Sequence, residues 1–185
     1  MQERKVLIWE IMVTLFVISF GSVLHFMYEW TNYSPFMGLF APVNESVWEH
    51  LKLGFWSLLI ISVIEFPFIK KQINNFFLAK LIGVISLELV IIIVFYTYTA
   101  ITGKSILAID IGSYVAGAVV CQLVAIQIMT KSKNKIVANI AGIAGLIVIA
   151  VIFMVFTYLT PRVAIFEDEN TGQYGTRWRT DKVME

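Results

Sequence analysis

The stretch Ile136–Leu159 reads IVANIAGIAGLIVIAVIFMVFTYL and contains no charged side chain. A helix over this stretch would be about 36 Å long, and roughly 20 apolar residues already cross the hydrocarbon core of a bilayer. Comparable apolar stretches recur, so that the predicted spans are 6–28, 47–69, 76–100, 105–129 and 136–159. We therefore predict an all-α, polytopic integral membrane protein, folded as a compact bundle of five transmembrane helices.

The composition of the 185-residue chain excludes an ordinary soluble protein. Hydrophobic residues make up 58% of it and charged residues 15%, whereas soluble domains average about 45–50% and 25%. The formal charge of +1 provides no basic surface for nucleic acid, so none is expected as a partner. The single cysteine, Cys121, excludes an internal disulfide and is expected to be a packing residue.

The domain organisation follows from the spans. Residues 1–159 are predicted to form one membrane domain, and residues 160–185 form the largest polar segment outside it. Within that segment Phe166–Gly175 has the composition of an acidic turn, which predicts a solvated hairpin or a lid over the end of the bundle.

Basic residues in the short loops predict the orientation, because cytoplasmic loops carry an excess of lysine and arginine. The basic segments on one side of the predicted bundle are Arg4/Lys5, Lys70/Lys71 and Lys131/Lys133/Lys135. They predict a cytoplasmic N-terminus and an external C-terminal tail, although the tail contains Arg162, Arg177 and Arg179. Lys80, just inside the third span, is expected to snorkel to the cytoplasmic face.

Small and polar residues at helical spacing mark the faces that should pack against other helices, because lipid offers polar groups no partner. Ser113, Gly117, Cys121 and Ala125 form a small-xxx-small series, which permits close helix contact. Glu10, Thr14 and His25 lie on one stripe of the first span, and His50 belongs to a similar stripe of the second. We predict that His25 and His50 lie within about 10 Å of each other, the distance between packed helices.

The segment Pro42–His50 reads PVNESVWEH and has two interpretations. In the first, Ser46 and Glu49 form a capping box, in which Ser46 accepts from the Glu49 amide and the Glu49 carboxylate accepts from the Ser46 amide. Trp48 then lies in an interfacial aromatic belt with Trp30.

In the second interpretation the segment contributes to a shared site near one membrane face. His25, Glu29, His50 and Asp110 would converge there, and such a set of nitrogen and oxygen ligands fits zinc with a position left open for water. Zinc would activate that water, and Glu49 or Glu45 would act as catalytic base or support a ligand. The alternative is a hydrogen-bonded histidine and carboxylate network without metal.

Glu88 is the ionisable residue nearest the middle of a span. One interpretation is a protonated acid bonded to a neighbouring helix, and the other is a proton or cation relay.

Four segments carry a resemblance to a known family: His25–Trp30 (HFMYEW), Pro42–Lys52 (PVNESVWEHLK), Tyr96–Gly103 and the tail from Phe166 to Gly175. They resemble an uncharacterised family of small bacterial multi-pass membrane proteins, labelled only as a domain of unknown function. The resemblance implies a bacterial cytoplasmic membrane and no known activity. It adds Asn44, Ser46 and Trp48 to the candidate binding residues.

A looser similarity links His25, Glu88, Asp110 and Gly117 to VanZ-like proteins, which are associated with glycopeptide resistance. The asparagine expected between the aspartate and the glycine is missing, since Ser113 and Tyr114 occupy that stretch. This resemblance implies envelope biology only.

These observations favour an outward-facing polar site that binds or processes an envelope or lipid head group. A non-enzymatic membrane scaffold or accessory subunit, as an oligomer or with a membrane partner, is the main alternative. A small transporter that uses Glu88 is the third.

Overall fold

The computed structural model describes residues 2–176, and within them it is helical except for loops and one short hairpin. The long helices are α1 (Gln2–Trp30), α3 (Val47–Ile69), α4 (Phe76–Thr102), α5 (Leu107–Lys131) and α6 (Ile136–Tyr158). Two short elements complete the described chain, α2 (Pro35–Gly38) and the 3-10 helix η1 (Ala164–Phe166). All five long helices are long and apolar enough to cross a membrane, so the predicted fold class is confirmed. The chain is a multi-pass membrane protein.

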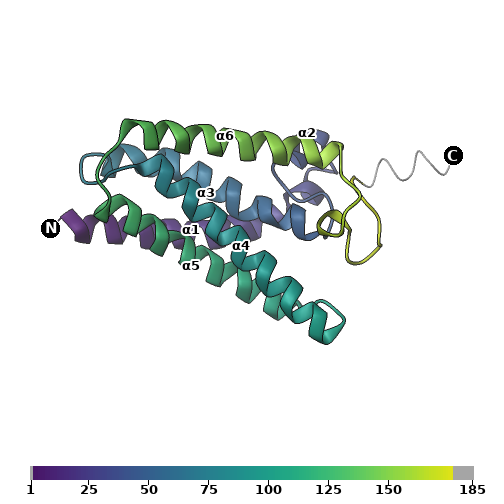
Figure 1. The fold of residues 1–185 in the computed structure, drawn as a ribbon. Coiled ribbons are helices and arrows are strands. Elements are labelled where there is room, and N and C mark those ends of the chain that lie inside the picture. Colours follow the sequence, from purple (N-terminus) through teal and green to yellow (C-terminus); the bar gives the residue numbers. More distant parts are fainter. Residues whose placement is uncertain (1, 177–185) are drawn as a thin grey trace.

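The helices pack as a bundle with two distinct ends (Figure 1). α4 packs against α5 and α6, and α1 packs against α3 and α5. The N-terminus and the loops at residues 70–75 and 132–135 lie at one end of the bundle. The other end, called the His25 end below, carries the loops at 31–46 and 103–106 and the segment 159–176.

Small residues allow the backbones of α4, α5 and α6 to approach closely. A Cβ added to Gly117 would lie 3.0 Å from the carbonyl oxygen of Leu87, and one added to Gly142 would lie 2.3 Å from the backbone nitrogen of Leu78. Ser113, Gly117, Cys121 and Ala125 are all buried, as the predicted seam requires.

The predicted snorkelling of Lys80 is wrong. Its side chain is only 1% exposed, and its ammonium group lies 2.9 Å from Glu10 and 2.8 Å from Glu65. Those two carboxylates come from α1 and α3, so helix packing surrounds the ammonium group with counter-charges. Burial of a charge is tolerated where it is paired in this way.

Candidate metal centre at the His25 end

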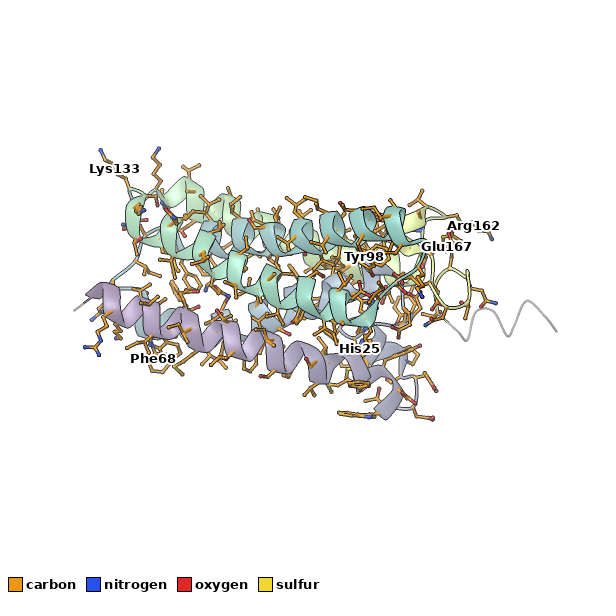
Figure 2. The ribbon with its side chains drawn as sticks, turned by 90° about the horizontal axis from the view of Figure 1, so that it is seen from below. His25, Phe68, Tyr98, Lys133, Arg162 and Glu167 are labelled. Atoms are coloured by element: carbon orange, nitrogen blue, oxygen red, sulfur yellow. The ribbon has the colours of Figure 1, made fainter. Side chains whose placement is uncertain are left out.

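Three predicted site residues meet at the His25 end. His25 comes from α1, His50 from α3, and Glu45 from the loop between α2 and α3; one ligand atom from each lies within 4.8 Å of the others. The two imidazole rings stack with a centroid distance of 5.3 Å, which confirms the predicted proximity. Figure 2 shows His25 at the same end as Tyr98 and Glu167, and Lys133 at the opposite end.

The hydrogen bonding of His50 decides what its second nitrogen can do. Its Nδ1 lies 2.8 Å from the carbonyl oxygen of Ser46, and because a carbonyl only accepts, Nδ1 carries a proton. Its Nε2 lies 3.4 Å from the Glu45 carboxylate. A lone pair on Nε2 would repel an ionised carboxylate, so the contact calls for a proton held between the two groups or for a cation that both of them bind. Histidines that ligate metals characteristically donate their other N–H to a carbonyl in this way.

Side-chain hydrogen bonds hold the turn that comes before α3, which contains Glu45 and Ser46. The Ser46 hydroxyl accepts from the Glu49 amide at 3.4 Å and caps α3, as predicted. The reciprocal half of the capping box is wrong, because the Ser46 amide donates to the Asn44 side chain at 2.9 Å.

The carboxylate of Glu49 is engaged elsewhere. It accepts from the Val43 amide at 3.0 Å and pairs with Lys52 at 2.5 Å, and both partners of that pair are buried. The Lys52 ammonium also donates to the Gly38 carbonyl and the Thr157 hydroxyl. Glu49 therefore joins α3 to the loop, its partner Lys52 joins α3 to α6, and Glu49 is not one of the three clustered residues.

The segment after α6 forms the predicted hairpin, with an isolated antiparallel bridge between Glu167 and Tyr174. It docks on the α3 turn rather than standing free in solvent. The Asp168 carboxylate accepts from the Glu45 amide at 3.0 Å, and the Asn44 side chain donates to the Gly175 carbonyl at 3.0 Å. Arg177 and Arg179 lie outside the described residues.

Asp168 is a residue that the sequence analysis did not single out. Its Oδ1 accepts from the Asn170 amide and from the amide and hydroxyl of Thr171, so one carboxylate both closes its own turn and holds the backbone of Glu45. The Asp-x-x-Thr spacing is typical of such a turn. Its long-range contact with Glu45 has no signal in the sequence.

The loop carboxylates around the cluster titrate differently. The imidazole of His50 lowers the pKa of Glu45 below its ordinary value. Burial opposes ionisation of Asp168, but the hydrogen bonds it accepts from Glu45, Thr171 and Asn170 outweigh burial and lower its pKa. Burial raises the pKa of Glu169, helped by the charge of Asp110 and opposed by a hydrogen bond from Ser105. Negative charge thus concentrates on Glu45 and Asp168.

Two of the four predicted metal ligands lie outside the three-residue cluster. Glu29 is exposed, one turn beyond His25. Asp110 accepts a hydrogen bond from the Tyr98 hydroxyl at 2.6 Å, in the neighbourhood of Glu169. The sequence predicted that His25, Glu29, His50 and Asp110 converge near one membrane face. In the structure the carboxylate that lies beside the two imidazoles is that of Glu45, from the loop between α2 and α3.

The other candidate residues lie further away. Trp48 is half-buried and packs against Phe153 of α6 and Phe166 of η1, whereas Trp30 is 68% exposed. A shared place of the two rings in an interfacial belt stays a prediction. Glu88 lies in the middle part of α4, with one buried carboxyl oxygen that has no hydrogen-bond partner among the described residues.

A family model matches residues 1–176, which include the three clustered residues and the hairpin. The chain belongs to DUF6512, a family of unknown function. Neither a curated protein nor a solved structure matches the chain. The expected membership in an uncharacterised family is thus confirmed, whereas the likeness of this DUF6512 chain to VanZ-like proteins stays a prediction.

Removing the Asp168 carboxylate is expected to release the backbone of Glu45. In D168A the amide of Glu45 should exchange hydrogen about 10–100-fold faster, since a hydrogen bond to a charged group contributes about 1.5–3 kcal/mol. In the wild type this protection should be complete above pH 3.8, the ordinary pKa, and be lost as the pH falls through the lower folded-state pKa.

Hydrogen exchange with mass spectrometry in detergent micelles measures this effect. E167A is the matched control, because Glu167 lies in the same hairpin and accepts from the Tyr174 hydroxyl without contacting Glu45. Equal exchange in D168A and E167A would contradict the role given to Asp168.

Proposed function

We propose that the His25 end holds a zinc ion on His25, Glu45 and His50, and that this centre binds the anionic head group of an envelope lipid. The observation that carries the proposal is the pairing of His50 Nε2 with the Glu45 carboxylate while Nδ1 is committed to the Ser46 carbonyl. Two neutral imidazoles and one carboxylate match the ligand set of zinc sites that keep an open coordination position.

The head-group assignment rests on where the three residues lie. They lie at an end of a bundle of helices long enough to cross a membrane, and a lipid presents its phosphate or carboxylate group near the ends of such helices. Zinc, when bound, supplies positive charge to such an oxygen ligand in its open position. The hairpin holds the backbone of Glu45 through the Asp168 carboxylate.

Each residue around the proposed zinc ion has a separate role. His25 and His50 supply nitrogen ligands, Glu45 supplies an oxygen ligand, and the Ser46 carbonyl orients His50. Glu169, whose pKa is raised by burial, lies within electrostatic range of His50 and Glu45, where it would carry a proton to or from a bound head group. Glu49 is excluded as a base by its pairing with Lys52.

We also propose that the N-terminus is cytoplasmic and that the His25 end faces outward in a bacterial cytoplasmic membrane, on the strength of the basic loops at the opposite end. Lys104 is exposed in the 103–106 turn, and the native Cys121 is buried. A K104C variant should therefore react with a membrane-impermeant maleimide added to intact cells. Reaction only after the cells are opened would reverse the orientation.

The zinc proposal predicts that substitutions of His50 and Ser46 change zinc binding to different extents. H50A removes a ligand and should weaken zinc binding by more than about 100-fold, beyond the 10–100-fold cost of losing a mere support of a ligand. S46A keeps the backbone carbonyl that orients His50, so it should bind zinc like the wild type. It should lose about 0.5–2 kcal/mol of stability, the cost of a helix cap.

Metal analysis of protein purified without chelator, followed by calorimetric titration with zinc chloride, measures both effects. The expected stoichiometry is one zinc per wild-type chain. Absence of zinc binding to the wild type, with equal losses of melting temperature in H50A and S46A, would overturn the proposal. It would instead support a hydrogen-bonded network in a membrane scaffold.

A further inference from the structure

A second ionic cluster, distinct from the His25 end, lies inside the other half of the bundle. The Lys80 ammonium is 2.9 and 3.0 Å from the two oxygens of Glu10, 2.8 Å from Glu65 and 3.5 Å from the amide oxygen of Gln122. These four residues come from α1, α3, α4 and α5, and none is more than 3% exposed. Glu10 lies eight residues from the start of α1, about 12 Å along the helix.

The charges of this cluster do not balance without an added proton. Two ionised carboxylates and one ammonium group sum to −1, and an uncompensated buried charge is costly. Both carboxylates lie within 3.0 Å of the same ammonium group. Two ionised carboxylates held this close together repel each other, whereas a protonated acid beside a carboxylate does not. One proton on either carboxyl group brings the sum of the charges to zero.

The buried ion pair of Glu49 and Lys52, near the His25 end, provides a comparison. It contains one carboxylate and one ammonium group, which balance without a proton. Both clusters are buried ion pairs, but only the cluster around Lys80 has a second carboxylate. The need for a proton comes from that second carboxylate and not from burial alone.

Other titratable groups near the Lys80 cluster are few. Cys121 of α5 is buried within electrostatic range of Lys80, Glu10 and Glu65, and Glu88 lies two turns beyond Lys80 along α4. α6 contributes the apolar Leu146 to the wall of the cavity beside Lys80. Neither Cys121 nor Glu88 brings positive charge, so neither replaces the proton.

Two cavities reach the cluster. One, of about 190 Å³, is lined by Lys80 and Ser62 among apolar side chains, and the other, of about 230 Å³, is lined by Glu10, Thr14 and Gln122, again among apolar side chains. The hydroxyl of Ser62 and the amide nitrogen of Gln122 have no hydrogen-bond partner among the described residues, although both residues are more than nine-tenths buried. Each cavity exceeds the roughly 10–15 Å³ that one water needs, and each presents an unpaired polar group next to an ion of the cluster.

We propose that Glu10, Glu65 and Lys80 form a proton-binding site within the membrane, which exchanges one proton with water in these cavities. On release, the O–H bond of the protonated carboxyl breaks and its proton passes to a water molecule, leaving two carboxylates on either side of the ammonium group. Lys80 holds the two carboxylates together in both states. Gln122 offers the cavity water a hydrogen-bond donor.

Infrared spectroscopy of the full chain in lipid nanodiscs tests this site. E88Q serves as the background, because it removes from the spectrum the buried carboxyl group that lies two turns beyond Lys80 on α4. A carboxylic acid C=O band should be present at neutral pH, shift in heavy water because the proton exchanges, and disappear in both E10Q and E65Q. Two separate variants keep the test decisive if one of them does not fold.

E49Q, in the balanced ion pair, is the matched control and should leave the band unchanged. A band that survives in E10Q and E65Q, or one that does not shift in heavy water, would overturn the proposal. So would a band that is absent in sodium chloride and appears in choline chloride, since a sodium ion would then neutralise the cluster. Zinc titration of E10Q should give the wild-type result, which separates this site from the His25 end.

Discussion

K80M is expected to lower the free energy of unfolding by about 3–5 kcal/mol, the cost of removing one partner from a buried ionic cluster. Lys80 is the common partner of Glu10 and Glu65, and the side chains of all three are at most 1% exposed. Without the ammonium group the one remaining negative charge of the Glu10–Glu65 pair has no counter-charge in an apolar interior. The pair must then take up a second proton or reach solvent, and reaching solvent would open the packing of α1 and α3 against α4.

Thermal melting in detergent micelles, read by circular dichroism, measures this loss. K71M is the matched control, because Lys71 is exposed in the loop after α3 and its replacement should change stability by no more than about 0.5 kcal/mol. The triple variant E10M/E65M/K80M should regain most of the loss, since apolar replacement of a whole buried cluster is often neutral or stabilising. A triple variant less stable than K80M would show that the ionic contacts, and not the unpaired charge, carry the stability.

G142A is expected to destabilise the protein by about 3 kcal/mol, at the upper end of the cost of overpacking a core. The added Cβ would lie 2.3 Å from the backbone nitrogen of Leu78 and 2.4 Å from the backbone carbon of Phe77. A flexible side chain could move aside, but a helix backbone cannot, so α6 must shift away from α4 as a whole.

The control for this substitution is G112A in α5. Gly112 is exposed, and a Cβ added there would meet nothing within 4 Å. Alanine is favoured over glycine in a helix by up to about 1 kcal/mol, so G112A should be neutral or slightly stabilising in the same melting experiment. Equal melting temperatures for G142A and the wild type would contradict the close approach of α4 and α6.

The amino-acid sequence by itself determined the five helices, because an apolar stretch long enough to cross a bilayer needs no tertiary information to be recognised. It also placed His25 and His50 in one layer, since their depths follow from residue counts along neighbouring spans. The cap of α3 by Ser46 and the hairpin after α6 were predictable too, as both depend on residues close together in the chain.

The partners of the polar side chains were decided only by the tertiary structure. Glu29 shares a helix with His25, yet the carboxylate beside the two imidazoles is that of Glu45, which comes from a loop. Asp168, more than a hundred residues away in the chain, holds the backbone of that loop. Lys80 likewise turned inward, although its position near a span end favoured snorkelling. Helix depth is a local property of the chain, whereas the rotation of each helix about its axis depends on the surfaces it packs against. That rotation decides which buried charges meet.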